Sequence, residues 1–118
     1  MNIKKFSQTT GLSAYTIRYY EKIGLFTHIH RNTSGHRSFT DHDVLWTGFI
    51  KRLKDTGMPL DKIKEYAQLR EKGEETASLR MNLLKKHAEL LEKKIALENY
   101  HLAKLKEKIK YYEKLTNR

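Results

Sequence analysis

Residues 3–24 read IKKFSQTTGLSAYTIRYYEKIG, and this stretch decides the fold of the first part of the chain. Ile3 and Phe6 lie three apart, as on one face of a helix, and Gly11 is a typical helix stop. Ser13 has the side chain of a helix N-cap, and apolar residues recur from there to Gly24. Two short helices joined by a tight turn are predicted, which is the arrangement of a helix-turn-helix.

The segment that follows predicts a small hairpin, which we call the wing. Residues 25–31 have no helical period, and residues 32–35 read NTSG, a cluster of turn formers. The return strand of the wing is expected over residues 36–39.

Two further helices are predicted beyond the wing. Thr40, with Asp43 three residues later, forms a capping-box pattern before a helix that ends at Gly57. Pro59 is expected in the first turn of the next helix, which stops before Gly73.

The C-terminal part reads as one long helix with a coiled-coil seam. From about residue 76 to residue 115 there is no Gly or Pro, and apolar residues recur in alternating steps of four and three, interrupted at Glu98. At ~1.5 Å per residue such a helix is roughly 60 Å long, so its seam requires a second chain. The residues expected to form this dimer contact are Leu84, Leu91, Ile95, Leu102, Leu105 and Ile109. A second apolar row, Leu83, Leu90 and Leu97, is expected to dock a DNA-binding domain.

The predicted fold is therefore mainly α. A winged helix-turn-helix DNA-binding domain is expected over residues 1–74, and a helix forming an antiparallel coiled-coil dimer over residues 75–118. The 24 Lys and Arg against 14 Asp and Glu give a formal charge of +10, which points to a polyanionic partner. No stretch approaches the roughly 20 apolar residues that cross a bilayer, so we expect a cytoplasmic protein without a membrane partner. The chain has no cysteine, which excludes disulfides and thiolate chemistry.

The second helix of a helix-turn-helix enters the major groove, and its side chains here suit DNA. Arg18 can contact guanine or clamp a phosphate, while hydroxyls donate to phosphate oxygens. A basic wing can reach the flanking backbone or the minor groove. The candidate DNA contacts are Ser13, Tyr15, Thr16, Arg18, Tyr19, Arg31, His36, Arg37, Lys51 and Lys54. For the two lysines a solvated helix face is an equally good interpretation, and Ile17 and Tyr20 are expected in the core.

The sequence favours neither a metal site nor catalysis. His28 and His30 lie two apart, but no further ligand is at hand. The glycines are isolated, and no nucleophile and base set is present. We therefore expect no metal, no cofactor and no enzyme activity. A small effector could bind where the fourth helix meets the long helix, near Tyr66, Leu69, Leu79 and Met81, but ordinary core is the better interpretation of these residues.

The first 70 or so residues resemble the MerR family of bacterial regulators in order and spacing. The matching positions are Phe6, Gly11-Leu12-Ser13, Thr16-Ile17-Arg18-Tyr19-Tyr20-Glu21, Gly24-Leu25, Arg31, Gly35-His36-Arg37-Ser38-Phe39, Asp43, Phe49-Ile50, Gly57-Met58-Pro59-Leu60 and Ile63. The resemblance implies a homodimer that binds a promoter with an over-long spacer. It also implies that an activating signal lets the protein bend and untwist that DNA, which acts on RNA polymerase indirectly. Arg18 and Tyr19 would then hold the backbone or base edges, and Arg37 would anchor the wing to phosphate.

Three positions depart from this pattern. The family's wing usually reads Gly-Tyr-Arg-x-Tyr, whereas His36 and Phe39 replace its two tyrosines here. The stretches over residues 32–39 and 49–59 are similar to the aldehyde-responsive branch, which suggests a carbonyl or general stress response. Arg52, however, stands where that branch carries a cysteine.

Two other classes of function stay open at this point. One is an architectural DNA-bending or recombination accessory protein with the same DNA-binding domain. The other is a coiled-coil interaction module whose lysine-rich end binds an acidic protein or a membrane. The long dimerisation helix favours regulation of a two-fold operator.

Overall fold

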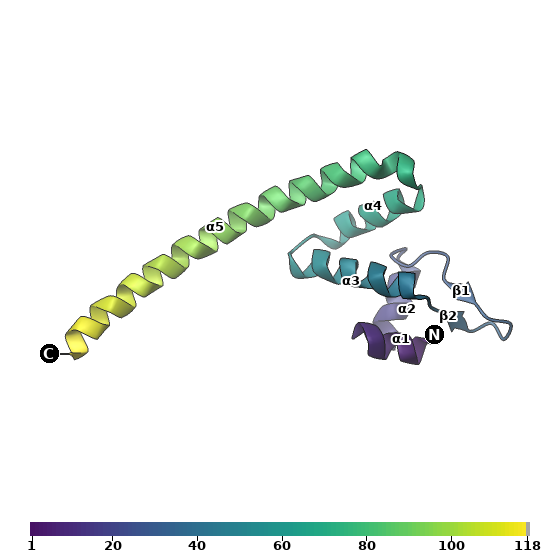
Figure 1. The fold of residues 1–118 in the computed structure, drawn as a ribbon, viewed down its shortest axis with the longest axis horizontal. Helices are drawn as coiled ribbons and strands as arrows, with labels where there is room; N and C mark the ends of the chain where they lie inside the picture. Colours follow the sequence, from purple (N-terminus) through teal and green to yellow (C-terminus); the bar gives the residue numbers. More distant parts are fainter. Residues whose placement is uncertain (118) are drawn as a thin grey trace. The chain divides into compact units, whose positions relative to one another are not determined.

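The computed structural model describes residues 1–117, and its mainly helical fold confirms the predicted class (Figure 1). The elements in chain order are α1 (Ile3–Thr10), α2 (Ala14–Lys22), β1 (His30–Arg31), β2 (Arg37–Ser38), α3 (Asp41–Asp55), α4 (Leu60–Glu71), the 3-10 turn η1 (Glu74–Thr76) and α5 (Ala77–Thr116). The chain divides into two compact units, of which the first runs from Met1 to Leu83 and the second begins at Leu84. The division predicted between residues 74 and 75 stays a prediction, and the first unit extends into α5.

Local capping explains where the first three helices begin. The Asn2 side chain accepts a hydrogen bond from the Lys5 amide at 2.9 Å, and the Ser13 side chain accepts one from the Thr16 amide at 3.0 Å. Thr40 and Asp43 form the expected capping box at the start of α3. Each cap satisfies an amide that has no partner within its own helix.

Glycine and proline end and start helices nearly as predicted. Gly11 has φ 78°, a left-handed conformation that an L side chain rarely adopts, and its amide donates to the Ser7 carbonyl. Pro59 lies at the N-cap of α4, one residue before the first turn in which it was expected.

The core of the first unit is built from side chains of α1, α2, α3, α4 and the loop after α2. The largest fully buried side chains are Phe6, Ile17, Leu25, Ile50, Ile63 and Thr47. Phe6 stacks on Phe39 with ring centroids 4.1 Å apart and an interplanar angle of 4°. The Trp46 indole donates to the Leu25 carbonyl at 2.8 Å, so the loop after α2 is fixed to α3. α1 contacts both α2 and α3, and α3 contacts α4.

The predicted grouping of Leu79 and Met81 with Tyr66 is wrong. Tyr66 is buried, whereas Leu79 and Met81 are 56% and 47% exposed. The open hollow beside Tyr66, about 280 Å³ in volume, is lined instead by His42, Leu45, Trp46, Phe49, Arg70 and Arg80. An effector bound in this hollow would contact aromatic rings and two guanidinium groups.

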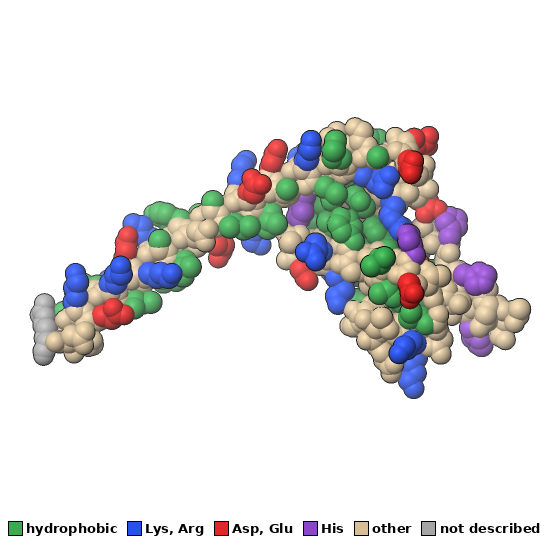
Figure 2. Space-filling view, in the orientation of Figure 1, with side chains coloured by type: hydrophobic (Ala, Val, Ile, Leu, Met, Phe, Trp, Pro, Cys, Tyr) green, Lys and Arg blue, Asp and Glu red, His purple; other side chains and the backbone are tan. Residues whose placement is uncertain are grey.

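The helix α5 carries exposed hydrophobic side chains along its length. Ile95, Leu102, Leu105 and Ile109 are exposed, and Leu84 and Leu91 are partly buried. Acidic, basic and apolar side chains alternate on its surface (Figure 2). A single helix of a coiled coil has the same exposed hydrophobic seam before it pairs with its partner. Within residues 1–117, no helix is both long and apolar enough for a membrane span.

Candidate nucleic-acid interface

The two faces of α2 separate core from candidate contact residues as predicted. Ile17 and Tyr20 are buried, whereas Arg18 and Tyr19 are exposed and Tyr15 is 79% exposed. The exposed side chains of Tyr15, Arg18 and Tyr19 are therefore accessible for contact with DNA, which stays a prediction.

The hydroxyls at the start of α2 have a structural task first. The Ser13 side chain caps the helix through the Thr16 amide, and its hydroxyl lies 3.0 Å from the Thr16 hydroxyl. Both residues stand at a helix N-terminus, where the helix dipole favours an anion. Their contact with DNA stays a prediction.

The wing is a two-stranded antiparallel hairpin in which Arg31 pairs with Arg37 and His30 with Ser38. The Asn32 side-chain oxygen accepts from the Ser34 and His36 amides, both at 3.0 Å, and so shapes the turn. His36 lies exposed on this turn. The base of the hairpin is fixed at Phe39, whose amide donates to the Met1 carbonyl at 2.7 Å.

A basic hollow brings together α1, α2 and the wing. It is about 450 Å³ in volume and is lined by Asn2, Ile3, Lys4, Arg18, Arg31, Asn32, Gly35, His36 and Arg37. Guanidinium groups and a helix N-terminus together suit phosphate oxygens. Four of the predicted contacts, Arg18, Arg31, His36 and Arg37, therefore meet at one site. Lys4 was missed, because its place beside the wing depends on the packing of α1.

Glu21 pairs with two arginines of the basic hollow, which the pattern of basic residues did not predict. Arg37 Nε donates to Glu21 Oε1 at 2.9 Å, and Arg31 Nη2 lies 3.7 Å from the same oxygen. The signal available in the sequence was an acid one turn after Arg18 in an otherwise basic segment.

The two candidate lysines of α3 make contacts inside the first unit. Lys51 Nζ donates to the Thr10 carbonyl at 2.8 Å, at the C-terminal end of α1, where a cation is favoured by the helix dipole. Lys54 Nζ lies 2.9 Å from the Tyr20 hydroxyl, and this hydrogen bond raises the pKa of Lys54. Both lysines therefore tie α3 to the helix-turn-helix, and phosphate contact remains a separate prediction for them.

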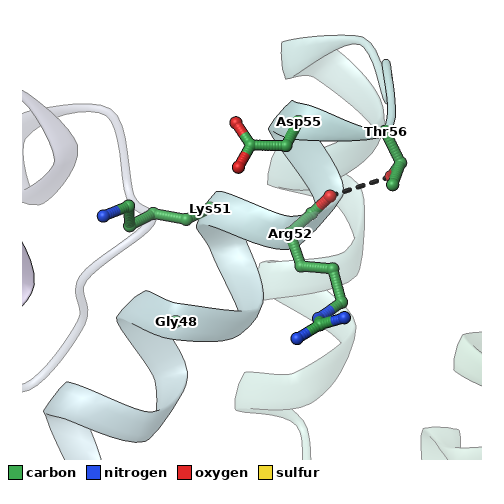
Figure 3. Close-up of a pocket in the computed structure, with 5 residues that line it drawn as sticks. All are labelled: Gly48, Lys51, Arg52, Asp55 and Thr56. Atoms are coloured by element: carbon green, nitrogen blue, oxygen red, sulfur yellow. Dashed lines mark hydrogen bonds between the residues drawn. The ribbon is translucent and has the colours of Figure 1, made fainter.

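An open hollow on α3, about 450 Å³ in volume, is lined by Gly48, Lys51, Arg52, Asp55 and Thr56 (Figure 3). Lys51 and Arg52 point away from each other, and the Arg52 carbonyl accepts from the Thr56 hydroxyl at 2.8 Å. By the resemblance to the aldehyde-responsive branch, Arg52 occupies the position of that branch's cysteine. This surface presents charge and no thiol.

The loop before the wing is fastened to the end of α4. The Thr27 hydroxyl donates to Glu71 Oε2, and His28 Nε2 pairs with Glu71 Oε1. His28 has φ 55°, a left-handed backbone conformation that is uncommon for residues other than glycine. Over the 117 residues described, no three His, Cys, Asp or Glu side chains are grouped to hold a metal ion.

Glu71 should contribute to the acid sensitivity of the fold. The Thr27 hydrogen bond, with the charge of His28, lowers the pKa of Glu71 below its usual range. A carboxylate with a lowered folded-state pKa stabilises the fold above its unfolded pKa, and the contribution is lost as pH falls through the folded value. As pH falls from about 5 to 3, we expect the free energy of unfolding to fall less in the Glu71→Gln variant than in the wild type. Urea unfolding at each pH measures this difference. Glu75→Gln is the control, and identical acid limbs for all three proteins would contradict the assignment.

The fold and the basic hollow between α1, α2 and the wing define a class of protein: a winged helix-turn-helix that binds DNA. The comparisons give the family. Residues 1–69 match the MerR HTH family regulatory protein, and residues 48–97 match the MerR DNA-binding region. The chain belongs to the MerR family of DNA-binding transcriptional regulators. The relatives are transcriptional regulators rather than enzymes.

Similar proteins and structures agree with this assignment. An HTH-type transcriptional regulator of Haemophilus influenzae is 36% identical over 110 residues, covering 93% of this chain and 82% of the relative. The regulator AdhR of Bacillus subtilis is 37% identical and matches 71% of this chain, which spans 60% of AdhR. A MerR family regulator from Listeria monocytogenes has a TM-score of 0.90 at 40% identity, covering 96% of this chain and 86% of the other. HiNmlR, a family member lacking the sensor domain and solved on promoter DNA, has a TM-score of 0.85 at 34% identity, covering 96% and 90%.

Proposed function

We propose that this regulator binds promoter DNA as a homodimer in the cytoplasm and controls transcription by bending or untwisting an over-long spacer. The observation that carries the proposal is the basic hollow shared by α1, α2 and the wing. It places Arg18 of the helix that enters the major groove beside Arg31 and Arg37, which can clamp the adjacent backbone. The neighbour HiNmlR was solved on promoter DNA, which supports the same use of this face.

The dimer part of the proposal rests on α5. MerR regulators act as dimers, and the hydrophobic seam of α5 is exposed in the single chain from Ile95 to Ile109. An antiparallel pair would bury this seam and give two DNA-binding faces related by a two-fold axis. Two such faces fit a two-fold operator with half-sites one helical turn or a multiple apart.

The signal is proposed to be a carbonyl compound or a general stress. This part rests on the resemblance of residues 49–59 to the aldehyde-responsive branch. Since the chain has no cysteine and Arg52 stands at the expected thiol position, any response uses chemistry other than a thiol adduct. RNA polymerase is affected only through the shape of the promoter.

Replacing Arg37 with alanine should weaken binding to every DNA sequence by a similar factor. A phosphate contact carries little base information, and each lost contact makes the negative slope of log affinity against log salt shallower by about 0.9. Fluorescence anisotropy on several duplexes across a salt series measures both effects. Lys72→Ala, the loss of an exposed cation at the end of α4, is the matched control. A change confined to one base position would contradict a phosphate role for Arg37.

Selection of bound fragments from the host genome, followed by footprinting of one of them, tests the function as a whole. We expect a palindrome inside a promoter whose spacer is too long. Recovery of recombination sites without promoters would overturn the regulatory mechanism in favour of an architectural role.

A further inference from the structure

We propose that Glu21 is a positioning residue for DNA recognition, which holds the wing against α2 and presents Arg37 to the DNA backbone. The inference rests on the proposed DNA-binding face. Glu21 is an acidic side chain among the basic groups of that face. Its carboxylate repels phosphate, so charge attraction to DNA does not explain its presence there.

The wing contains a repulsive pair that requires a counter-charge. Arg31 and Arg37 are directly opposite each other across the two strands. Like charges at opposed positions destabilise a strand pair. Each strand is only two residues long, so few backbone hydrogen bonds oppose this repulsion.

Glu21 supplies that counter-charge from the neighbouring helix. Its Oε1 lies 2.9 Å from Arg37 Nε and 3.7 Å from Arg31 Nη2. The side chains of Glu21 and Arg37 are each 25% exposed, so salt screens their attraction less than it screens an open surface pair. Since Glu21 belongs to α2, its carboxylate joins the helix that enters the major groove to the wing that flanks it.

The geometry of Arg37 leaves its phosphate-binding end available. Arg37 meets Glu21 through Nε, and a guanidinium held in this way still offers its two Nη groups for a bidentate contact with phosphate. Arg37 lines the basic hollow together with Arg18, whereas Glu21 is absent from the described residues that line it. Glu21 therefore lies behind the arginines and acts through them.

Charge and positioning predict opposite results for Glu21→Gln. Removing an acid near DNA should, by charge alone, raise affinity for all DNA. Loss of positioning should instead lower affinity for all DNA, because Arg37 no longer meets the phosphate backbone in a fixed position. We expect binding to the selected site and to a random duplex to fall by a similar factor, about 10-fold.

The test is a double-mutant cycle with Glu21→Gln, Arg37→Gln and both changes, in the full-length chain. Binding is measured by fluorescence anisotropy on a duplex of a genomically selected site and on a scrambled duplex of equal length. Glu75→Gln makes the same charge change in η1 and serves as the control. Thermal melts confirm folding, and Glu21→Asp, which keeps the charge at shorter reach, should recover part of the affinity for both duplexes.

The expected result is weaker binding of Glu21→Gln to both duplexes and a double variant no weaker than Arg37→Gln alone. The positioning role is overturned if Glu21→Gln binds either duplex as tightly as the wild type or more tightly, if it binds like Glu75→Gln, or if the two losses add. Should Arg37→Gln also bind both duplexes like the wild type, the proposed DNA-binding face would fail together with the positioning role. If Arg37→Gln binds weakly while the Glu21 role fails, the proposed DNA-binding face is still supported.

Discussion

Replacing Ile95 and Leu102 together with glutamate is expected to convert the protein to a monomer and to weaken binding to its operator about 100-fold or more. Both side chains are half-exposed in the single chain and lie on the predicted seam of α5. In an antiparallel coiled coil each would pack into a hole of the partner helix, where a carboxylate would lose its hydration without gaining a partner. A monomer reads one half-site, and the gain from linking two half-sites is lost.

Sedimentation analysis and anisotropy titration on one operator duplex measure the two effects together. Ala96→Glu with Ala103→Glu is the matched control, since it adds the same two charges to exposed positions one residue after each seam residue. We expect the control to remain dimeric. Equal loss of dimer in both double variants would contradict the seam, and a monomer with full operator affinity would favour the architectural function.

Replacing Phe6 with alanine should cost about 3–5 kcal/mol of folding stability, which is a large part of the total for a small domain. Phe6 is fully buried, stacks on Phe39 and meets Phe26 edge-on with centroids 6.0 Å apart. The change leaves a cavity where α1, the loop after α2 and the base of the wing converge. Urea unfolding followed by circular dichroism, at one fixed protein concentration because dimerisation adds to apparent stability, measures the effect.

Tyr15→Ala is the control for Phe6→Ala, because it removes an aromatic ring from solvent. Its effect on stability should be within about 0.5 kcal/mol, while its DNA binding should weaken if Tyr15 contacts DNA as predicted. Equal destabilisation by the two changes would show that the Phe6 cluster does not hold the domain together.

Much of the local structure could be predicted from residues close together in the sequence. Ser13 and the Thr40–Asp43 pair cap helices because a short polar side chain can reach an unpaired amide only three residues away. The burial of Ile17 and Tyr20 followed from their spacing on one helix face. Such predictions succeed because the interaction and the sequence signal have the same short range.

The mistaken and missed residues depend on contacts over longer range. Leu79 and Met81 had the right chemistry for core, yet the first turns of α5 leave them in solvent. Lys4 reaches the basic hollow only because α1 packs beside the wing. Hydrophobic pattern alone could not separate these cases, since roughly half of a folded protein's surface is apolar.

By itself, the sequence determined the helix-turn-helix, the wing, the two following helices and a 40-residue helix with a heptad seam, because caps, turns and periodicity act over a few residues. Only the tertiary structure decided what each charged residue does. Arg18, Arg31 and Arg37 meet in one hollow, while Lys51 and Lys54 are tied to residues 41 and 34 positions away. Long charged side chains accept many partners equally well, so their partner is whichever group the packed core brings within reach.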